Sequence, residues 1–299
     1  METFETREAW LAARRLGIGG SDVPAILGIS PWKTPLQVWA SKLGLADDDE
    51  TSYTMRRGSH MEPLLWRELE SEVPGLMSFP LSRTIVTGPE PWMLYSPDAF
   101  LFRVDDQTAA LGEGKSHPRG SADWDDGVPA HVVAQVQWGM HVCDLGVSYV
   151  AVDLGTEFKW ARVARDPAWW PKHRDALIDF GCRVVDREAP AATGAEGDRR
   201  ALGAMYRFHT LEARSLDPAF LEVAHEYDET VAAIKVLEQK KDDIVNRVCE
   251  AIGEAERGVL PDGSGWSWKR QSKPKMVADP TQPRHEFRVV RRFGASKED

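Results

Sequence analysis

The clearest pattern of apolar and polar positions along this chain predicts a β-hairpin. Residues 99–102 are apolar or aromatic, as is typical of a strand, and the polar pair Asp105-Asp106 follows as a turn signal. Residues 108–115 then form the predicted return strand. If the turn has two residues, Asp98 lies directly opposite Glu113, and the Cβ atoms of such a pair are roughly 5 Å apart.

Helical spacing and short β-like runs alternate over the rest of the first 190 residues. Helices are predicted over residues 8–16, 23–28, 59–72, 129–143 and 169–185, and a further helix starts at Thr34-Pro35. Strands are predicted over residues 81–87, 148–153 and 158–163. This order of elements predicts an α/β fold in which helices flank a mixed sheet.

A change in composition divides the chain after residue 188. Residues 189–200, APAATGAEGDRR, are small and polar, so they are predicted to be a linker between a core over residues 1–188 and an extension over residues 201–299. In the extension, residues 227–251 have helical spacing that Lys241 interrupts. This spacing predicts a helical hairpin or a coiled-coil-like helix for a partner.

A basic tail follows the predicted helix. Residues 266–270 (WSWKR) and 287–292 (FRVVRR) are predicted strands in which aromatic and basic side chains mix. Such a tail either binds nucleic acid or forms a small β module with a solvated basic face. The whole chain carries a net charge of −10, which argues against a broad DNA-binding face, but residues 265–297 hold nine Lys or Arg against two Asp or Glu.

Other features of the composition exclude several classes of protein. No run approaches the roughly 18 apolar residues of a membrane span, and the first residues lack a signal-peptide pattern, so we expect a cytoplasmic protein. The three cysteines, Cys143, Cys182 and Cys249, are isolated. Their spacing argues against a zinc site, a disulfide framework and an iron–sulfur cluster.

The predicted hairpin is also the best candidate for chemistry. Asp98 and Glu113 face each other, and Lys115 lies on the same side of the sheet. Opposed carboxylates destabilise a hairpin unless something offsets them, and a hard cation such as Mg²⁺ prefers carboxylate oxygens. The alternative is a solvated hairpin rim in which Lys115 neutralises Glu113.

Two predicted helix starts offer further candidates. Gly19-Gly20-Ser21 precedes residues 23–28, so Ser21 is either an N-cap or part of a phosphate site at a helix N-terminus. Ser59 and Glu62 fit a capping box at the start of the helix over residues 59–72, with Pro63 in its first turn.

Several short motifs together resemble one family of enzymes. Ser96-Pro97-Asp98 followed by Glu113-Gly114-Lys115 resembles the PD-(D/E)XK nuclease signature. The motifs R57-G-S-H-M-E62 upstream, A134-Q-V-Q137 downstream and R15-L-G-I-G-G-S-D22 near the start are similar to lambda exonuclease and the YqaJ-type viral recombinases. The resemblance covers roughly residues 10–190 and implies a PD-(D/E)XK (restriction-endonuclease-like) fold.

The resemblance implies a role for each matching residue. Asp98, Glu113 and the backbone carbonyl of Gly114 would bind one or two Mg²⁺, for which Mn²⁺ can substitute. Lys115 would position and activate the attacking water, while Glu62 and Gln135 would complete the site. Arg15 and Ser21 would hold the 5′-phosphate of a DNA end, although their spacing is one residue shorter than in the phage enzyme.

The implied activity is 5′-to-3′ exonuclease action on linear double-stranded DNA, which leaves 3′ single strands for phage-type recombination in the host cytoplasm. The family also implies a single-strand annealing protein as a partner and a homo-oligomeric ring. An endonuclease or a single-strand nuclease of the same fold is the nearer alternative. A non-catalytic scaffold that binds DNA ends is an alternative of another class.

Overall fold

The computed structural model describes residues 1–46, 53–117, 122–208 and 212–269. The described chain forms two units, one that ends at Arg207 and one that begins at Phe208. The predicted strand over residues 287–292 and most of the basic tail lie outside the described residues.

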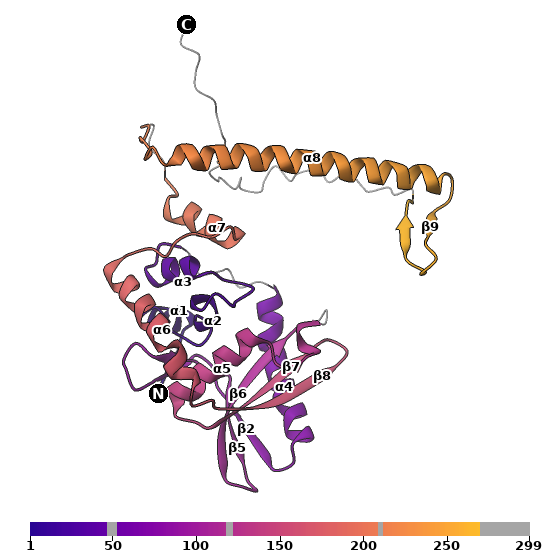
Figure 1. The fold of residues 1–299 in the computed structure, drawn as a ribbon. Coiled ribbons are helices and arrows are strands. Elements are labelled where there is room, and N and C mark those ends of the chain that lie inside the picture. Colours follow the sequence, from indigo (N-terminus) through magenta and orange to yellow (C-terminus); the bar gives the residue numbers. More distant parts are fainter. Residues whose placement is uncertain (47–52, 118–121, 209–211, 270–299) are drawn as a thin grey trace, which may run out of the picture. The chain divides into compact units, whose positions relative to one another are not determined.

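A five-stranded mixed sheet is the centre of the first unit, in the order β2-β5-β6-β7-β8 (Figure 1). Neighbouring strands are antiparallel except β6 and β7, which run parallel. The strands are β2 (Leu76–Pro80), β5 (Ala99–Arg103), β6 (Thr108–Ser116), β7 (Val147–Asp153) and β8 (Phe158–Ala164). The predicted α/β class with a mixed sheet is therefore confirmed.

The β5–β6 hairpin has the predicted register. Ala99 pairs with Gly112 and Arg103 pairs with Thr108. One step further along this register sets Asp98 opposite Glu113. The turn closes through Gln107, whose φ of 54° lies in the left-handed region. The hairpin therefore brings the two carboxylates together as its sequence predicts.

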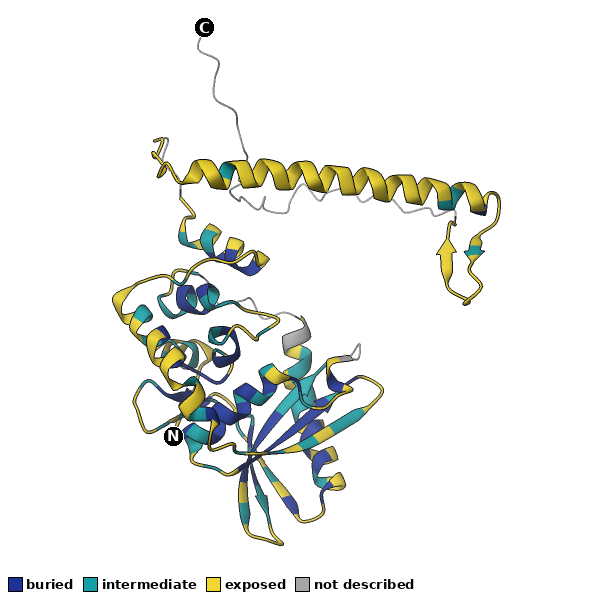
Figure 2. Cartoon of the chain, in the orientation of Figure 1, coloured by how far each residue is buried: buried dark blue, intermediate teal, exposed yellow. Residues whose placement is uncertain are grey.

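Helices cover both faces of the sheet, and each face has its own apolar core. One core joins β6 and β7 to residues of α2 (Val23–Ile26), α3 (Pro35–Lys42), α5 (Ala130–Cys143) and α6 (Trp169–Asp186). The other core joins the sheet to α4 (Tyr53–Glu72) through Leu65, Trp66 and Leu69. Figure 2 shows the buried residues concentrated in the sheet and in the helix sides that face it.

Smaller elements surround this three-layer core. Strands β1 (Glu2–Thr3), β3 (Thr84–Thr87) and β4 (Leu94–Tyr95) form a separate three-stranded sheet. The first unit also contains helix α1 (Arg7–Arg14) and the short 3-10 helix η1 (Ala122–Trp124). Strand β3 is shorter than the strand predicted over residues 81–87.

Helix α4 begins earlier than predicted, at Tyr53. Ser59 therefore lies inside the helix, and the predicted capping box with Glu62 is wrong. Pro63 also lies in the helix interior rather than in its first turn. Proline removes one helical hydrogen bond there, but burial of Leu65, Trp66 and Leu69 offsets the cost.

The predicted linker over residues 189–200 is helical in its second part. Helix α7 spans Glu196–Met205. Asp198, which is 1% exposed, accepts hydrogen bonds from Thr34 Oγ1 and, over 2.6 Å each, from the Thr193 amide and hydroxyl. These contacts attach α7 to Thr34, the N-cap of α3. The unit extends to Arg207 rather than ending at residue 188.

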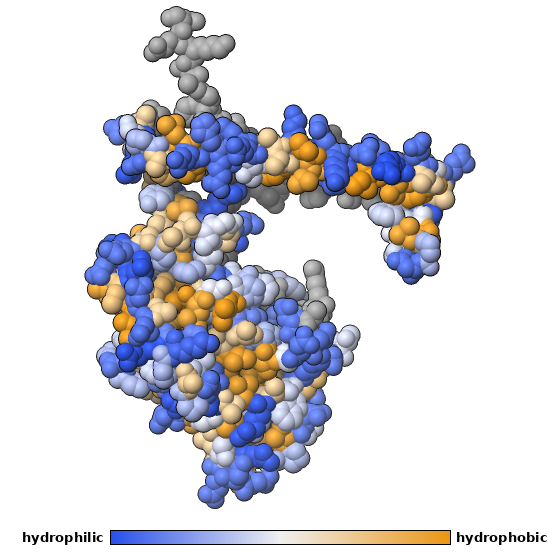
Figure 3. Space-filling view, in the orientation of Figure 1, coloured by the Kyte–Doolittle hydropathy of each residue, from blue (hydrophilic) through white to orange (hydrophobic). Residues whose placement is uncertain are grey.

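The second unit contains one long helix, α8 (Phe220–Ile252), and a hairpin of β9 (Arg257–Val259) and β10 (Gly265–Ser267). The predicted helix over residues 227–251 lies within α8, and the described residues form one continuous helix there instead of a helical hairpin. Apolar side chains such as Ile234 and Leu237 are exposed along α8, as the orange patches in Figure 3 indicate. Within the described ranges, no helix is long and apolar enough to cross a membrane.

Candidate active site

Glu113 on β6 is the centre of the candidate site, because three side chains donate hydrogen bonds to its carboxylate. Glu113 is 2% exposed. Tyr95 Oη donates to Oε2 over 2.8 Å, while Lys115 Nζ and Gln135 Nε2 each donate to Oε1 over 2.6 Å. A buried carboxylate is costly unless donors and a positive charge compensate for it, and these three groups supply both.

Asp98 adds a second carboxyl group beside the first. Its Oδ2 accepts a hydrogen bond from the Gly114 amide over 2.9 Å. Burial, followed by the charge of Glu113, raises the pKa of Asp98 well above its usual range. Burial and Glu113 also raise the pKa of Glu62 on α4. Three carboxyl groups therefore repel one another here, and a cation would relieve that repulsion.

Lys115 is the cation that the chain itself supplies. Burial alone would lower the pKa of Lys115, but Glu113 and Asp98 outweigh it and raise that pKa. Besides its bond to Glu113, Lys115 Nζ donates to Gln135 Oε1 over 3.1 Å. Gln135 thus bonds to both Lys115 and Glu113, which fixes the position of each side chain relative to the other.

This cluster lies in the wall of a cleft of about 760 Å³. Its lining includes every residue predicted to act in catalysis: Glu62 from α4, Asp98 before β5, Glu113 and Lys115 from β6, and Gln135 from α5. Residues that are up to 73 positions apart in sequence therefore meet in one concave site. A concave site with several convergent polar groups is the usual form of an active site.

Of the two residues predicted to bind phosphate, Ser21 lines the cleft and Arg15 is not among the described residues that line it. Arg14 lines the cleft instead, and its Nη2 donates to Ser21 Oγ over 2.6 Å. The Arg14 guanidinium also lies 4.6 Å from the ring centroid of Trp10. Neighbouring helical positions point about 100° apart, so a shift of one residue decides which arginine faces the cleft.

The segment around Ser21 also differs from its prediction in another respect. The N-cap of α2 is Asp22, without a side-chain capping bond, so Ser21 does not cap this helix. Asp22 Oδ2 accepts from the Gly19 amide over 2.8 Å and pairs with Lys42 Nζ over 2.6 Å. Burial would raise the pKa of Asp22, but Lys42 and Arg14 outweigh it and lower that pKa. Asp22 is therefore part of a partly buried ion pair that supports the segment.

Sequence reasoning missed Tyr95, although it directly precedes the Ser96-Pro97-Asp98 motif. The Tyr95 side chain is 1% exposed and lies against two glycines. A Cβ atom at Gly20 would lie 2.5 Å from Tyr95 Cε2, and a Cβ at Gly139 would also collide with the ring. Gly20 is therefore required by this close approach. The glycine pair before Ser21 was the indication in the sequence, because a side chain that packs closely against the backbone requires glycine there. The sequence did not identify Tyr95 as that side chain.

The donor set around Glu113 suits a hard divalent cation. Carboxylates and a main-chain carbonyl are the ligands that Mg²⁺ and Mn²⁺ prefer, and Mg²⁺ commonly keeps several waters. Among the described residues, no three His, Cys, Asp or Glu side chains form a complete ligand cluster. An ion held by Asp98 and Glu113 would therefore complete its coordination with the Gly114 carbonyl, water or substrate.

The placement of these motifs defines the class of the first unit. Ser96-Pro97-Asp98 directly precedes β5, and Glu113-Gly114-Lys115 lies on β6, the antiparallel neighbour of β5. Helices flank the mixed sheet that contains both strands, which is the PD-(D/E)XK arrangement. In a comparison of sequences, residues 9–146 match the model of the YqaJ-like viral recombinase domain. The predicted resemblance to the YqaJ-type viral recombinases is therefore confirmed.

Individual relatives can also be named. The chain is 27% identical over 263 residues to the uncharacterised protein YqaJ of Bacillus subtilis (strain 168), covering 85% of this chain and 81% of that protein. Two crystal structures of LHK-Exo, an alkaline exonuclease from Laribacter hongkongensis, are each 16% identical over 60% of this chain and 93% of theirs. Their TM-scores are 0.48 for the complex with dAMP and 0.47 for the other structure.

Proposed function

We propose that this protein is a metal-dependent exonuclease that degrades linear double-stranded DNA from the 5′ end and leaves 3′ single-stranded overhangs for recombination. The observation that carries the proposal is the convergence of Asp98, Glu113 and Lys115 with Glu62 and Gln135 in one cleft. The viral recombinase domain supports DNA as the substrate, since recombination acts on DNA ends.

In this proposal Asp98, Glu113 and the Gly114 carbonyl would hold one or two Mg²⁺ or Mn²⁺ ions. Such an ion, when bound, polarises a phosphoryl oxygen and lowers the pKa of a bound water. Lys115 is positioned by Glu113 and Gln135, so its ammonium would orient the attacking water beside the scissile phosphate. Glu62 would add a further carboxylate to the same charge cluster.

The polarity of the proposed reaction rests on the Arg14–Ser21 pair. A guanidinium and a hydroxyl that already contact each other offer charge-assisted donors to a terminal 5′-phosphate. Both residues line the same cleft as Lys115. We therefore assign the 5′-phosphate contact to Arg14 and Ser21 rather than to Arg15 and Ser21.

The test is to incubate the protein with linear duplex DNA that carries a 5′-phosphate, in Mg²⁺ or in EDTA. We expect Mg²⁺-dependent release of mononucleotides from the linear DNA alone, and loss of this release in Lys115→Ala. A duplex with a 5′-hydroxyl end should be degraded more slowly, and Arg14→Ala should remove that difference. Release from the 3′ end would refute the polarity.

A circular duplex separates the nearer alternatives from the proposal. Cleavage of the circle would identify an endonuclease, and preference for single strands would identify a single-strand nuclease. Retained binding to DNA ends without any turnover would leave a non-catalytic scaffold. We further propose a single-strand annealing protein as partner and a ring of identical subunits, which co-purification and sedimentation equilibrium would test.

A further inference from the structure

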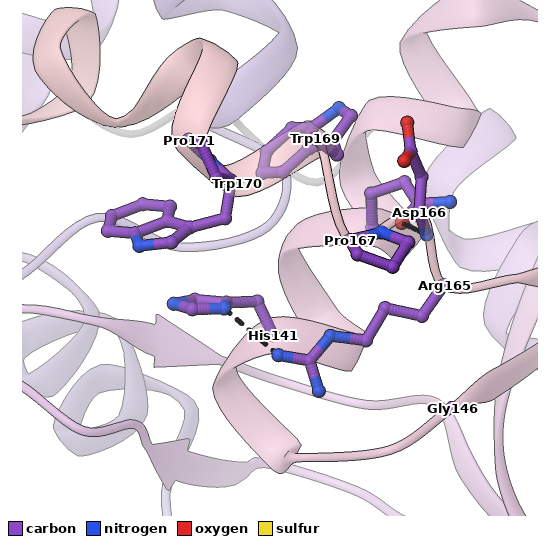
Figure 4. A pocket seen from close by; sticks show the side chains of 9 residues that line it. His141, Gly146, Arg165, Asp166, Pro167, Trp169, Trp170 and Pro171 are labelled. Atoms are coloured by element: carbon purple, nitrogen blue, oxygen red, sulfur yellow. Dashed lines mark hydrogen bonds between the residues drawn. The ribbon is translucent and has the colours of Figure 1, made fainter.

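A second cavity, of about 420 Å³, lies at the C-terminal end of α5 and shares no lining residue with the catalytic cleft. Ring side chains dominate its wall, as Figure 4 shows. The ring and basic residues that line it are His141, Arg165, Pro167, Trp169, Trp170 and Pro171. None of them has a part in the proposed hydrolysis.

The aromatic wall of this cavity is fixed in place. The Trp170 and His141 rings are stacked, with centroids 4.4 Å apart and an angle of 20° between their planes. Trp170 also contacts the buried Trp138 at a centroid distance of 5.8 Å. His141 thus covers one face of the Trp170 ring, and these contacts hold the ring in place before any ligand binds, which reduces the entropic cost of binding.

Arg165 supplies a positive charge beside these rings. Its Nη2 donates to His141 Nδ1 over 3.2 Å, and its Nη1 pairs with Asp144 over 3.0 Å (Figure 4 draws the bond to His141). The Asp144 side chain is 94% exposed, so this ion pair is screened by water and contributes little stability. A phosphate can therefore replace Asp144 on the guanidinium.

The other polar side chains of the cavity are engaged within the protein. Gln137 donates to the Ala164 carbonyl over 2.8 Å and accepts from the Asp166 amide over 2.9 Å. The Asp166 carboxylate accepts from the Ala168 amide over 2.8 Å. What remains for a ligand is a set of ring faces with one guanidinium beside them, together with the negative charge of Asp166.

We propose that this cavity binds one nucleotide unit of single-stranded DNA, with the base against the face of Trp170 and the phosphate on Arg165. Stacking on an aromatic side chain and contact with a basic group are the two elements of single-strand recognition that tolerate any sequence. A proline-rich peptide would also use the rings, but it has no anion for Arg165.

This inference deepens the proposed function and rests on it for the origin of the ligand, because the proposed exonuclease generates a single strand. The cavity gives that strand a point of attachment apart from the catalytic cleft. The binding itself requires no turnover, so it can be tested in EDTA whether or not the protein is a nuclease.

The first measurement is photo-cross-linking of a short single-stranded oligonucleotide that contains 5-iododeoxyuridine, with the full-length protein in EDTA. After digestion with trypsin, we expect the cross-link in the peptide of residues 166–172, which contains Trp169 and Trp170. Cross-links confined to peptides of the catalytic cleft would overturn the proposal. Failure of the nuclease proposal is a separate result, namely no mononucleotide release in Mg²⁺.

The second measurement is the affinity of the same oligonucleotide for three variants, by fluorescence anisotropy. Trp170→Leu should weaken binding by at least fivefold, the lower limit for loss of one stacked base. Arg165→Ala should weaken binding and reduce the slope of log K against log salt by about 0.7. Asp144→Asn should strengthen binding, because it removes the acid that competes for Arg165.

Asp144→Asn is also the matched control for folding, since Asn tolerates the left-handed backbone of Asp144 (φ 52°). Thermal unfolding of each variant separates loss of binding from loss of structure. Unchanged affinity in folded Arg165→Ala and Trp170→Leu would refute the site. If a proline-rich peptide binds more tightly than the oligonucleotide, the cavity is a site for a protein partner. That result would also refute the proposed nucleotide site.

Discussion

The hydroxyl of Tyr95 is the most direct test of the arrangement around Glu113. Tyr95→Phe removes one oxygen and keeps the ring that packs against Gly20 and Gly139. The lost interaction is the 2.8 Å hydrogen bond to Glu113 Oε2, in a place where both residues are almost fully buried. Because water cannot replace the missing donor, the carboxylate loses part of its compensation.

The size of the effect follows from this environment. A hydrogen bond to a charged group contributes about 1.5–3 kcal/mol to the free energy of unfolding. For a unit of roughly 200 residues, each 1 kcal/mol lowers the melting temperature by about 2–4 °C. We therefore expect Tyr95→Phe to melt roughly 3–12 °C below the wild type, and to lose nuclease activity because Glu113 is less firmly held.

A double-mutant cycle with Glu113→Gln isolates the interaction from other effects of each substitution. We expect a coupling free energy of about 1.5–3 kcal/mol from urea unfolding. Tyr149→Phe is the matched control, because Tyr149 is buried and its hydroxyl has no hydrogen-bond partner in the described part of the chain. A coupling free energy below about 0.5 kcal/mol, the usual limit of additivity, would refute the assigned role of Tyr95.

Three further substitutions test separate parts of the first unit. Asp198 has a pKa that burial would raise but that hydrogen bonds from Thr193 and Thr34 hold below its usual range. Wild-type stability should therefore exceed that of Asp198→Asn above about pH 4, and melting curves should converge as the pH falls through the lowered folded pKa. Gly20→Ala should lower the melting temperature, since its Cβ would collide with Tyr95. Arg57→Ala should reduce nuclease turnover, and Arg57→Lys should restore it only in part, because the planar guanidinium contacts two groups at once.

The hairpin could be predicted in detail because two independent constraints agree there. The apolar run of residues 99–102 predicts the first strand, and a short turn at Asp105-Asp106 fixes the register of the return strand. Together they predicted that Asp98 lies opposite Glu113, and the observed pairing of Ala99 with Gly112 has this register.

Helix ends were less predictable because their signals are local and ambiguous. Ser59, Glu62 and Pro63 form a convincing start signal, yet the helix continues upstream to Tyr53. The Arg57 guanidinium donates to Ser116 Oγ over 2.6 Å and to Asp153 Oδ2 over 3.1 Å. These hydrogen bonds connect the upstream turn of α4 to the ends of β6 and β7. Such tertiary contacts override a capping pattern, and they are not visible in the sequence.

The predicted linker illustrates the same limit. Its composition resembles a flexible segment, but one residue, Asp198, finds three donors when the chain folds. Composition indicates how segments of this kind behave on average. Whether a particular carboxylate can be buried depends on the specific hydrogen-bond donors that surround it in the fold. The choice between Arg14 and Arg15 is of this kind as well, since it depends on the rotation of α1 relative to the cleft.

Helix α5 connects the two sites of the first unit. Gln135 contacts Glu113 and Lys115, whereas Gln137 and His141 line the second cavity. Around the helix, Gln137 points about 200° and His141 about 240° from Gln135, so the two sites lie on different faces of α5. Its interior side chains, including Val136 and Trp138, are fully buried, and a close-packed helix does not deform easily. A strand held in the second cavity should therefore affect how long DNA stays bound, while the geometry around Lys115 stays unchanged.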